Sequence, residues 1–164
     1  MVEAAEFRNA MSLLTGAVNV ITTAGETGRY GFTASAVCSV TDSPPTLLVC
    51  MNRNSSSHRY FTENGVLSVN VLASEQQAIS QVFASKLSPE ERFQHGDWET
   101  LATGAPVLKD ALVIFDCQVQ EMNNVGTHTI FICTIEAVKC NKHNQGLVYF
   151  NRAYHQVGEM DQVS

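Results

Sequence analysis

Small and hydroxylated side chains alternate with apolar ones along the segment Gly31–Thr41. Such a strand leaves room along one edge, where backbone amides and hydroxyl groups could bond the heteroatoms of a flat aromatic cofactor. Small residues in a strand also allow a neighbouring strand to approach closely, and this packing role explains the same composition. The segment is therefore a candidate ligand surface, with close packing as the alternative.

A second candidate segment, Asn52–Ser57, is rich in amide and hydroxyl donors and precedes an expected helix at His58–Asn64. The N-terminus of a helix presents unpaired N–H groups that can bind a phosphate. Arg53 and Arg59 could add positive charge, and Lys86, further along the chain, could reach the same phosphate or be solvated. A capped helix in an exposed turn is the alternative interpretation.

The remaining candidates lie in the second half of the chain. His128 follows Gly126-Thr127 at the entry to an expected strand, where it could orient a carboxamide or stabilise charge, because imidazole groups in general change charge near neutral pH. The tail Tyr149–His155 combines aromatic, cationic and imidazole side chains, which suit nucleotide stacking and phosphate contact. The alternative for His128 is an ordinary surface histidine. The alternative for the tail is a strand that closes a barrel.

Several motifs with well-defined chemistry are missing from the sequence. It has no Gly-x-Gly-x-x-Gly or Gly-x-x-x-x-Gly-Lys for phosphates and no Gly-x-Ser-x-Gly for hydrolysis. The histidines and cysteines show no metal-ligand spacing, so we expect no metal. If the protein is an enzyme, its chemistry is expected to come from an organic cofactor.

The elements that must position these residues are mostly strands. Hydrophobic patterning and turn residues predict strands at Ala17–Thr23, Tyr30–Thr41, Thr46–Asn52, Val66–Ala73, Val113–Met122, His128–Val138 and Gly146–Phe150, with Thr46–Asn52 buried on both faces. Helices are predicted at Glu3–Thr15, His58–Asn64, Glu75–Ser85 with Ser74 as its cap, and Ser88–Glu91, and a loop at His95–Pro106. The order shows no βαβ alternation, which favours an antiparallel β-barrel with peripheral helices.

Length and composition indicate one domain over residues 1–164. A net charge of −6 with 10 Lys and Arg disfavours binding to nucleic acid or to an anionic membrane surface. No apolar run reaches the roughly 18 residues of a membrane-spanning helix, and Met1–Arg8 lacks the basic start of a secretory signal. The five cysteines contain no Cys-x-x-Cys pair and lie mostly in apolar stretches, which is typical of a protein of the reducing cytoplasm.

Six blocks of the sequence, taken in order, resemble the short-chain flavin reductases, the reductase components of two-component flavin monooxygenases. The similarity extends from about Phe7 to His155. The blocks are Phe7-Arg8-x-Ala10-Met11, Ala17–Thr23, Gly31–Asp42, Pro44–Cys50, Gly126-Thr127-His128 and Gly146–Phe150.

The resemblance implies a mainly β fold, the split β-barrel of Greek-key, FMN-binding type, in a cytoplasmic homodimer. It implies reduction of FAD or FMN by NADH, through transfer of a hydride from nicotinamide C4 to flavin N5. The reduced flavin would diffuse to a separate oxygenase, such as an aromatic monooxygenase of the phenol or 4-hydroxyphenylacetate type.

The resemblance also assigns roles to residues. His128 would be the catalytic residue and would face the nicotinamide together with Arg152 and Tyr154. The isoalloxazine ring would be lined by Thr33, Ala34, Ser35, Ser39, Val40 and Thr41. The ribityl chain and phosphate would be held by Asn52, Ser55, Ser56 and Ser57, with Lys86 at the phosphate end and Asn70 and Phe83 completing the flavin pocket.

Two alternatives to this function stay open, and a third is disfavoured. One branch of the same family supplies an FMN reductase to a monooxygenase of pyrimidine degradation, and the two branches share these blocks. A flavin carrier without catalysis could use the same barrel. The ordered blocks argue against a relative of pyridoxamine-phosphate oxidase, whereas the choices of FAD or FMN and of NADH or NADPH are left undecided.

Overall fold

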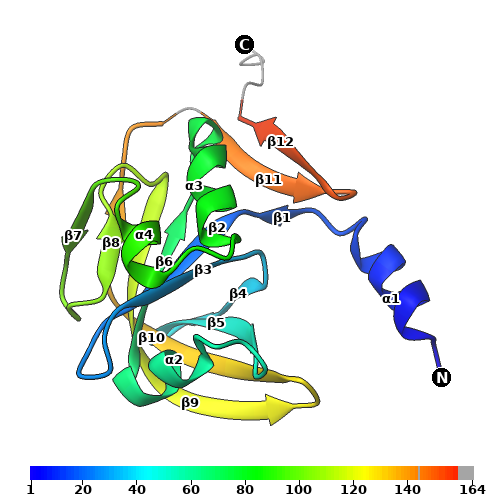
Figure 1. The fold of residues 1–164 in the computed structure, drawn as a ribbon, viewed down its shortest axis with the longest axis horizontal. Coiled ribbons are helices and arrows are strands. Elements are labelled where there is room, and N and C mark those ends of the chain that lie inside the picture. The colour runs from blue at the N-terminus through cyan, green and yellow to red at the C-terminus, as the bar shows by residue number, and fades with distance from the viewer. Residues whose placement is uncertain (144, 159–164) are drawn as a thin grey trace.

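A computed structural model describes residues 1–143 and 145–158. The body of the molecule is a seven-stranded antiparallel sheet in the order β3-β2-β6-β9-β10-β5-β4 (Figure 1). Its strands are β2 (Asn19–Thr23), β3 (Tyr30–Ala34), β4 (Val37–Asp42), β5 (Pro45–Asn52), β6 (Val66–Val71), β9 (Val113–Val125) and β10 (His128–Cys140).

The two edges of this sheet, β3 and β4, are consecutive in the chain and are separated only by Ser35 and Ala36. The sheet therefore curls until its edges approach, yet no β3–β4 ladder closes it within the described residues. This open, mainly β arrangement confirms the predicted split barrel with peripheral helices.

Two hydrophobic clusters cover the two faces of the sheet, because neighbouring residues of a strand point to opposite sides. Ile21 of β2 packs in one cluster with Val49, Leu67 and Phe131, whereas the adjacent Val20 packs in the other. The second cluster also takes Phe83 and Phe93 from two helices and Val107 from a short strand around the barrel. The strand β2 is consequently buried on both faces.

Short helices and strands surround the barrel: α2 (His58–Asn64), η1 (Ser74–Gln76), α3 (Gln77–Phe83), α4 (Pro89–Phe93), β7 (Trp98–Thr100) and β8 (Pro106–Leu108). The start of α4 is the best defined, since Ser88 Oγ accepts the Glu91 N–H at 3.2 Å and the Glu91 carboxylate accepts the Ser88 N–H at 2.8 Å. This reciprocal cap, with Pro89 in the first turn, confirms the predicted helix start.

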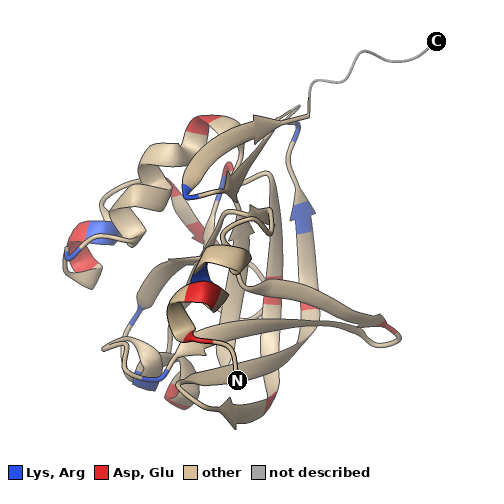
Figure 2. Cartoon of the chain, turned by 90° about the vertical axis from the view of Figure 1, so that its right-hand side faces the viewer, with Lys and Arg blue, Asp and Glu red and all other residues tan. Residues whose placement is uncertain are grey.

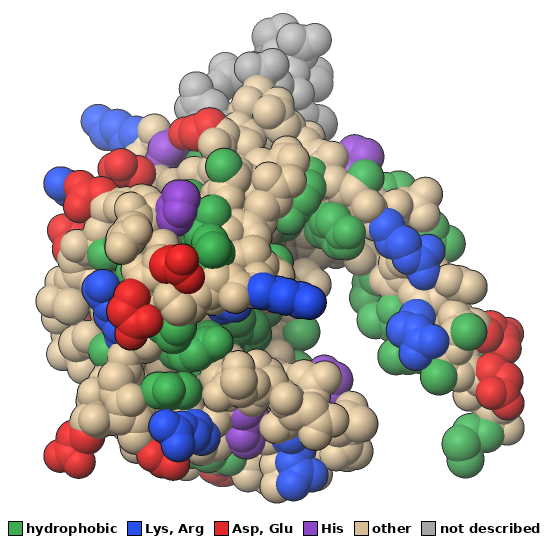
Figure 3. All heavy atoms as spheres, in the orientation of Figure 1, with side chains coloured by type: hydrophobic (Ala, Val, Ile, Leu, Met, Phe, Trp, Pro, Cys, Tyr) green, Lys and Arg blue, Asp and Glu red, His purple; other side chains and the backbone are tan. Residues whose placement is uncertain are grey.

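The N- and C-terminal segments form a separate arm. The strands β1 (Gly16–Ala17), β11 (Gly146–Phe150) and β12 (Ala153–Val157) make a small sheet, and α1 (Ala4–Met11) precedes it. Helix α1 buries none of its residues and stands away from the barrel (Figure 1). Hydrophobic side chains gather on the side of α1 that faces the body across a hollow (Figure 3).

Charged side chains are spread over helices, loops and strand ends and do not gather in one basic face in the view of Figure 2. Among the described residues, no helix is long and apolar enough to cross a membrane.

The structure corrects several predicted elements. The run Tyr30–Thr41 is two strands, β3 and β4, since the chain leaves the ladder at Ser35-Ala36. The expected loop His95–Pro106 contains β7, and Ser74 lies inside its helix, with Ala73 as the cap. Strand β5 is not buried on both faces, because Leu48 and Cys50 are only half-buried. Strands β8 and β12 were not predicted.

Candidate functional site

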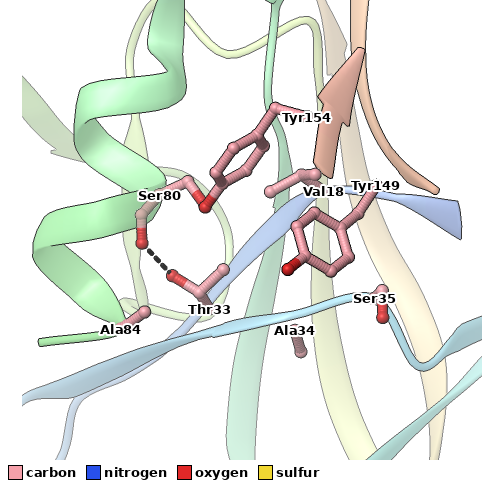
Figure 4. A pocket seen from close by; sticks show the side chains of 8 residues that line it. All are labelled: Val18, Thr33, Ala34, Ser35, Ser80, Ala84, Tyr149 and Tyr154. Carbon is pink, nitrogen blue, oxygen red and sulfur yellow. Dashed lines mark hydrogen bonds between the residues drawn. The ribbon is translucent and has the colours of Figure 1, made fainter. Parts of the chain in front are cut away.

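The end of β3 opens into a cavity of about 250 Å³, referred to below as the β3 cavity. Because β3 is an edge strand, the backbone groups along its outer side have no strand partner and can bind a ligand. The cavity is lined by Val18, Thr33, Ala34, Ser35, Ser80, Ala84, Tyr149 and Tyr154 (Figure 4). Three predicted ring contacts, Thr33, Ala34 and Ser35, thus lie together with the predicted nicotinamide contact Tyr154.

Hydrogen bonds fix the walls of the β3 cavity. Thr33 Oγ1 donates to the backbone carbonyl of Ser80 at 2.6 Å and ties the strand to α3 (Figure 4). Ser80 Oγ lies 2.8 Å from the hydroxyl of Tyr154, which ties α3 to β12. The rings of Tyr149 and Tyr154 pack edge to face with centroids 5.2 Å apart. These contacts give a flat ligand an aromatic wall facing a polar strand end.

The segment Asn52–Ser57, called the serine loop below, is an ordered turn next to this strand. The Asn52 side-chain oxygen accepts the Asn54 N–H at 2.9 Å, and the hydroxyls of Ser55 and Ser57 lie 2.8 Å apart. Ser56 Oγ lies 3.3 Å from the hydroxyl of Tyr30, which places the loop beside the start of β3. Because β3 spans only five residues, the serine loop and the β3 cavity serve opposite ends of one short strand.

His128 lies at the other side of the serine loop. The antiparallel register of β5 and β10 places it directly opposite Asn52, and the Arg53 N–H donates to the Thr127 carbonyl at 2.9 Å. The His128 side chain is exposed, and its Nδ1 lies 2.9 Å from Thr127 Oγ1. The structure therefore brings His128 next to the residues expected to bind the phosphate.

Arg152 does not join His128. It occupies the turn between β11 and β12 with a φ of 61°, and its guanidinium donates to Asn9 Oδ1 of α1 at 2.7 Å. Figure 1 shows this turn well apart from the turn between β9 and β10 that precedes His128. Within one chain, the predicted nicotinamide set of His128, Arg152 and Tyr154 is consequently divided.

Two predicted flavin contacts belong to the core. Asn70 is fully buried and donates to the Val20 carbonyl at 2.9 Å while accepting the Leu108 N–H at 2.7 Å. Phe83 is 1% exposed and packs against Gly31, where a Cβ would meet its ring at 2.6 Å. The structure gives both residues a packing role, which sequence spacing could not distinguish from a ligand contact.

The other predicted ring contacts also lie outside the β3 cavity. Ser39, Val40 and Thr41 are exposed on the edge strand β4, where the ladder to β5 is irregular between Ser39 and Thr41. Lys86 is exposed just after α3. Sequence reasoning missed Ser80 and Ala84, because only the packing of α3 against β3 brings them to the cavity.

One titratable group near His128 has an altered acidity. Burial, together with the positive charge of Arg53, lowers the pKa of His58 below its usual value. Its Nε2 lies 2.9 Å from Thr129 Oγ1. The neutral imidazole is therefore the main form of His58 at neutral pH.

The chain is similar to a known family and to individual proteins. Residues 11–158 match the family described as "Flavin reductase like domain". The chain is 54% identical over 154 residues to the FMN reductase (NADH) RutF of Pantoea ananatis, covering 94% of this chain and 81% of that protein.

Two solved structures are also similar. A protein of Haemophilus somnus is 54% identical with a TM-score of 0.93, covering 95% of this chain and all of that chain. BorF, the flavin reductase component of a bacterial two-component tryptophan halogenase, is 27% identical with a TM-score of 0.88, covering 96% of this chain and all of that one. The chain belongs to the flavin reductase-like domain family.

Proposed function

We propose that this protein is an NADH-dependent flavin reductase that reduces FMN, or FAD, and releases it to a separate enzyme. The observation that carries the proposal is the β3 cavity, where a free strand edge faces two tyrosine rings, with a loop of hydroxyl and amide donors at the other end of the same strand. The similarity to a protein named FMN reductase (NADH) supports the choice of both nucleotides. In this proposal the chain is a single flavin reductase domain.

The residues of the β3 cavity fit a planar ring. Thr33, Ala34 and Ser35 leave space at the strand end and offer backbone groups, while Tyr149 and Tyr154 supply apolar faces. When bound, a flavin accepts a hydride from the nicotinamide, and that step requires no acid or base from the protein. The protein's contribution is to hold the two rings in contact and to limit their orientations.

The serine loop and His128 complete the proposed site. The hydroxyls of Ser55 and Ser56 can donate to the flavin phosphate, and His128, which lies at the same end of β3, can donate to the nicotinamide nucleotide. Because His128 is exposed and opposite Asn52, it can reach a second nucleotide without disturbing the loop. It acts in the proposal by positioning the hydride donor.

The exposed apolar face of the arm supports a homodimer. Phe7, Leu13 and Leu14 are 57%, 58% and 69% exposed, which is unusual for a face that stays in water. Between α1 and the sheet lies a groove of about 680 Å³, whose lining includes Met11, Leu48 and Cys50. A second copy would cover this groove, and sedimentation that shows a monomer at every concentration would contradict it.

The partner that takes the reduced flavin is proposed to be an oxygenase. The two-component assignment of BorF supports a separate flavin-consuming enzyme. An aromatic monooxygenase is one candidate. The FMN reductase name of the RutF relatives supports a monooxygenase of pyrimidine degradation as well. All five cysteines are free, which agrees with a cytoplasmic location.

The proposal is tested by following NADH oxidation in four pairings, with NADH or NADPH and with FMN or FAD. We expect turnover that depends on added flavin and is fastest with NADH and FMN. A protein that binds flavin but oxidises neither nucleotide would be a flavin carrier, and the proposal would then be wrong.

A further inference from the structure

A second cavity, of about 400 Å³, lies beyond the serine loop and is called the Arg53 pocket below. It is lined by Arg53, Asn54, His58, Gly126 and Thr127, so it lies between the segment before α2 and the turn joining β9 to β10. No large apolar side chain lines it. Its composition is suited to a polar or anionic ligand and not to a flat ring.

The positive charge of Arg53 is not neutralised by the protein. Its backbone N–H donates to the Thr127 carbonyl at 2.9 Å, which anchors the residue. Its guanidinium makes one long contact, 3.4 Å from Nη1 to the Gly126 carbonyl, and no carboxylate lies within 4 Å in the part of the chain that the structure describes. Four of the five N–H groups of the guanidinium are thus left for an anion.

A chain of hydrogen bonds fixes the second basic group, His58. Thr129 is 1% exposed, and its hydroxyl donates to Asn124 Oδ1 at 2.7 Å. Because that proton is already used, Thr129 Oγ1 must accept the bond from His58 Nε2, which therefore carries a hydrogen. The ring is held in one orientation, with Nδ1 as the position that can gain a proton.

The groups around His58 make it responsive to an anion. Arg53 lies on its own segment, Thr129 and Phe131 face it from β10, and Asn124 of β9 bonds to Thr129. Arg53 is thus the charged group among them. Burial and this like charge keep the imidazole neutral in the free protein. An anion between Arg53 and His58 would raise the pKa of the imidazole and favour its protonated form.

We propose that the Arg53 pocket binds the adenosine-side phosphate of a dinucleotide, through Arg53 and His58. The inference rests on the proposed function and deepens it, because both NADH and FAD carry a second phosphate that FMN lacks. The pocket borders the serine loop at Arg53 and borders His128 at Thr127. Either FAD, bound at the loop, or NADH, bound at His128, could therefore place its second phosphate in the pocket.

The test compares Arg53→Met and His58→Asn with the unchanged protein. The substrates are NADH against reduced nicotinamide mononucleotide with FMN present, and FAD against FMN with NADH present. Lys109→Met is the matched control, because it removes one exposed positive charge that is paired with Asp97 in a different part of the fold.

We expect about a tenfold rise in the KM of the dinucleotide for Arg53→Met and a smaller one for His58→Asn, without change for the mononucleotide or the control. A rise confined to NADH assigns the pocket to the hydride donor, and a rise confined to FAD assigns it to the flavin. Equal changes for mononucleotides and dinucleotides, or none, would overturn the proposal.

Direct binding separates this inference from the activity. Titration calorimetry with ADP-ribose, which carries the phosphates and no reactive ring, should show binding that Arg53→Met weakens about tenfold. If ADP-ribose binds in this way but the protein oxidises neither NADH nor NADPH with either flavin, the proposed function is wrong and the phosphate-binding role of the pocket is retained. If turnover is present but ADP-ribose binding does not depend on Arg53, only the pocket is wrong.

Discussion

The β3 cavity and the serine loop differ in how the chain builds them. The cavity collects Val18, just before β2, and side chains from β3, α3, β11 and β12, so its lining comes from distant parts of the sequence. The serine loop consists of six consecutive residues, and the side chains of Asn52, Ser55 and Ser57 form hydrogen bonds within the loop. The cavity can therefore select a ligand by shape, whereas the loop can select one by charge and hydrogen bonding, and each property can be changed without the other.

Blocking the β3 cavity should have the largest effect. Ala84 lines the cavity and is exposed at the end of α3, so Ala84→Phe should fill the space without disturbing the core. We expect FMN affinity, measured by quenching of flavin fluorescence, to fall roughly 100-fold, the equivalent of about 2.8 kcal/mol. The matched control is Ala78→Phe on the exposed face of the same helix, which should bind FMN normally. Equal FMN affinity for both variants would show that the β3 cavity does not bind the flavin.

Charge in the serine loop should have a smaller and more selective effect. Ser56→Asp places a negative charge on an exposed loop side chain, where it would repel a phosphate. We expect about tenfold weaker binding of FMN, about 1.4 kcal/mol, and unchanged binding of riboflavin, which has no phosphate. Ser56→Asn, of similar size without charge, is the control. Weaker riboflavin binding in Ser56→Asp would show that the two regions are not separate.

His128 should affect the hydride donor alone. His128→Ala removes an exposed side chain and leaves the β5–β10 ladder intact. We expect stopped-flow reduction to slow, or its NADH requirement to rise, by roughly fivefold, because a single exposed hydrogen bond is worth about 1 kcal/mol. Flavin binding should not change. Loss of flavin binding with a normal rate of reduction would reject this role.

The pH dependence of dinucleotide binding should be the smallest of the expected effects. The pKa of His58 is lowered in the free protein, and an anion bound beside it favours the protonated ring. Dinucleotide binding therefore takes up a proton and should strengthen as the pH falls from 8 to 6, by roughly two- to threefold. His58→Asn should remove this dependence, and riboflavin binding should lack it in either protein. A dependence that survives in His58→Asn would assign it to another group.

The sequence was most informative where residues that act together are also neighbours. The serine loop and the Gly126-Thr127-His128 turn are continuous segments, and the β5–β10 register that joins them follows from two long strands. The longer strands, such as β5, β9 and β10, were predicted close to their observed bounds, because hydrophobic patterning defines them locally, whereas the short strands β7, β8 and β12 were missed. The split barrel followed from the resemblance to a family and not from the pattern alone.

The parts that were missed depend on packing between distant segments. Ser80 and Ala84 carry no sequence signal, since α3 reaches β3 only in the folded chain. The resemblance assigned Asn70 to the flavin pocket, whereas in the fold its amide satisfies buried backbone groups of Val20 and Leu108. The hydrogen bond from Arg152 to Asn9 could not be predicted, because the sequence does not show where α1 lies in the fold.

The most direct test of the account is a crystal structure of the protein with FMN. We expect the ring in the β3 cavity, against Thr33 to Ser35 and the rings of Tyr149 and Tyr154, with its phosphate on Ser55 and Ser56. A flavin whose ring lies elsewhere, with the β3 cavity left empty, would contradict the account.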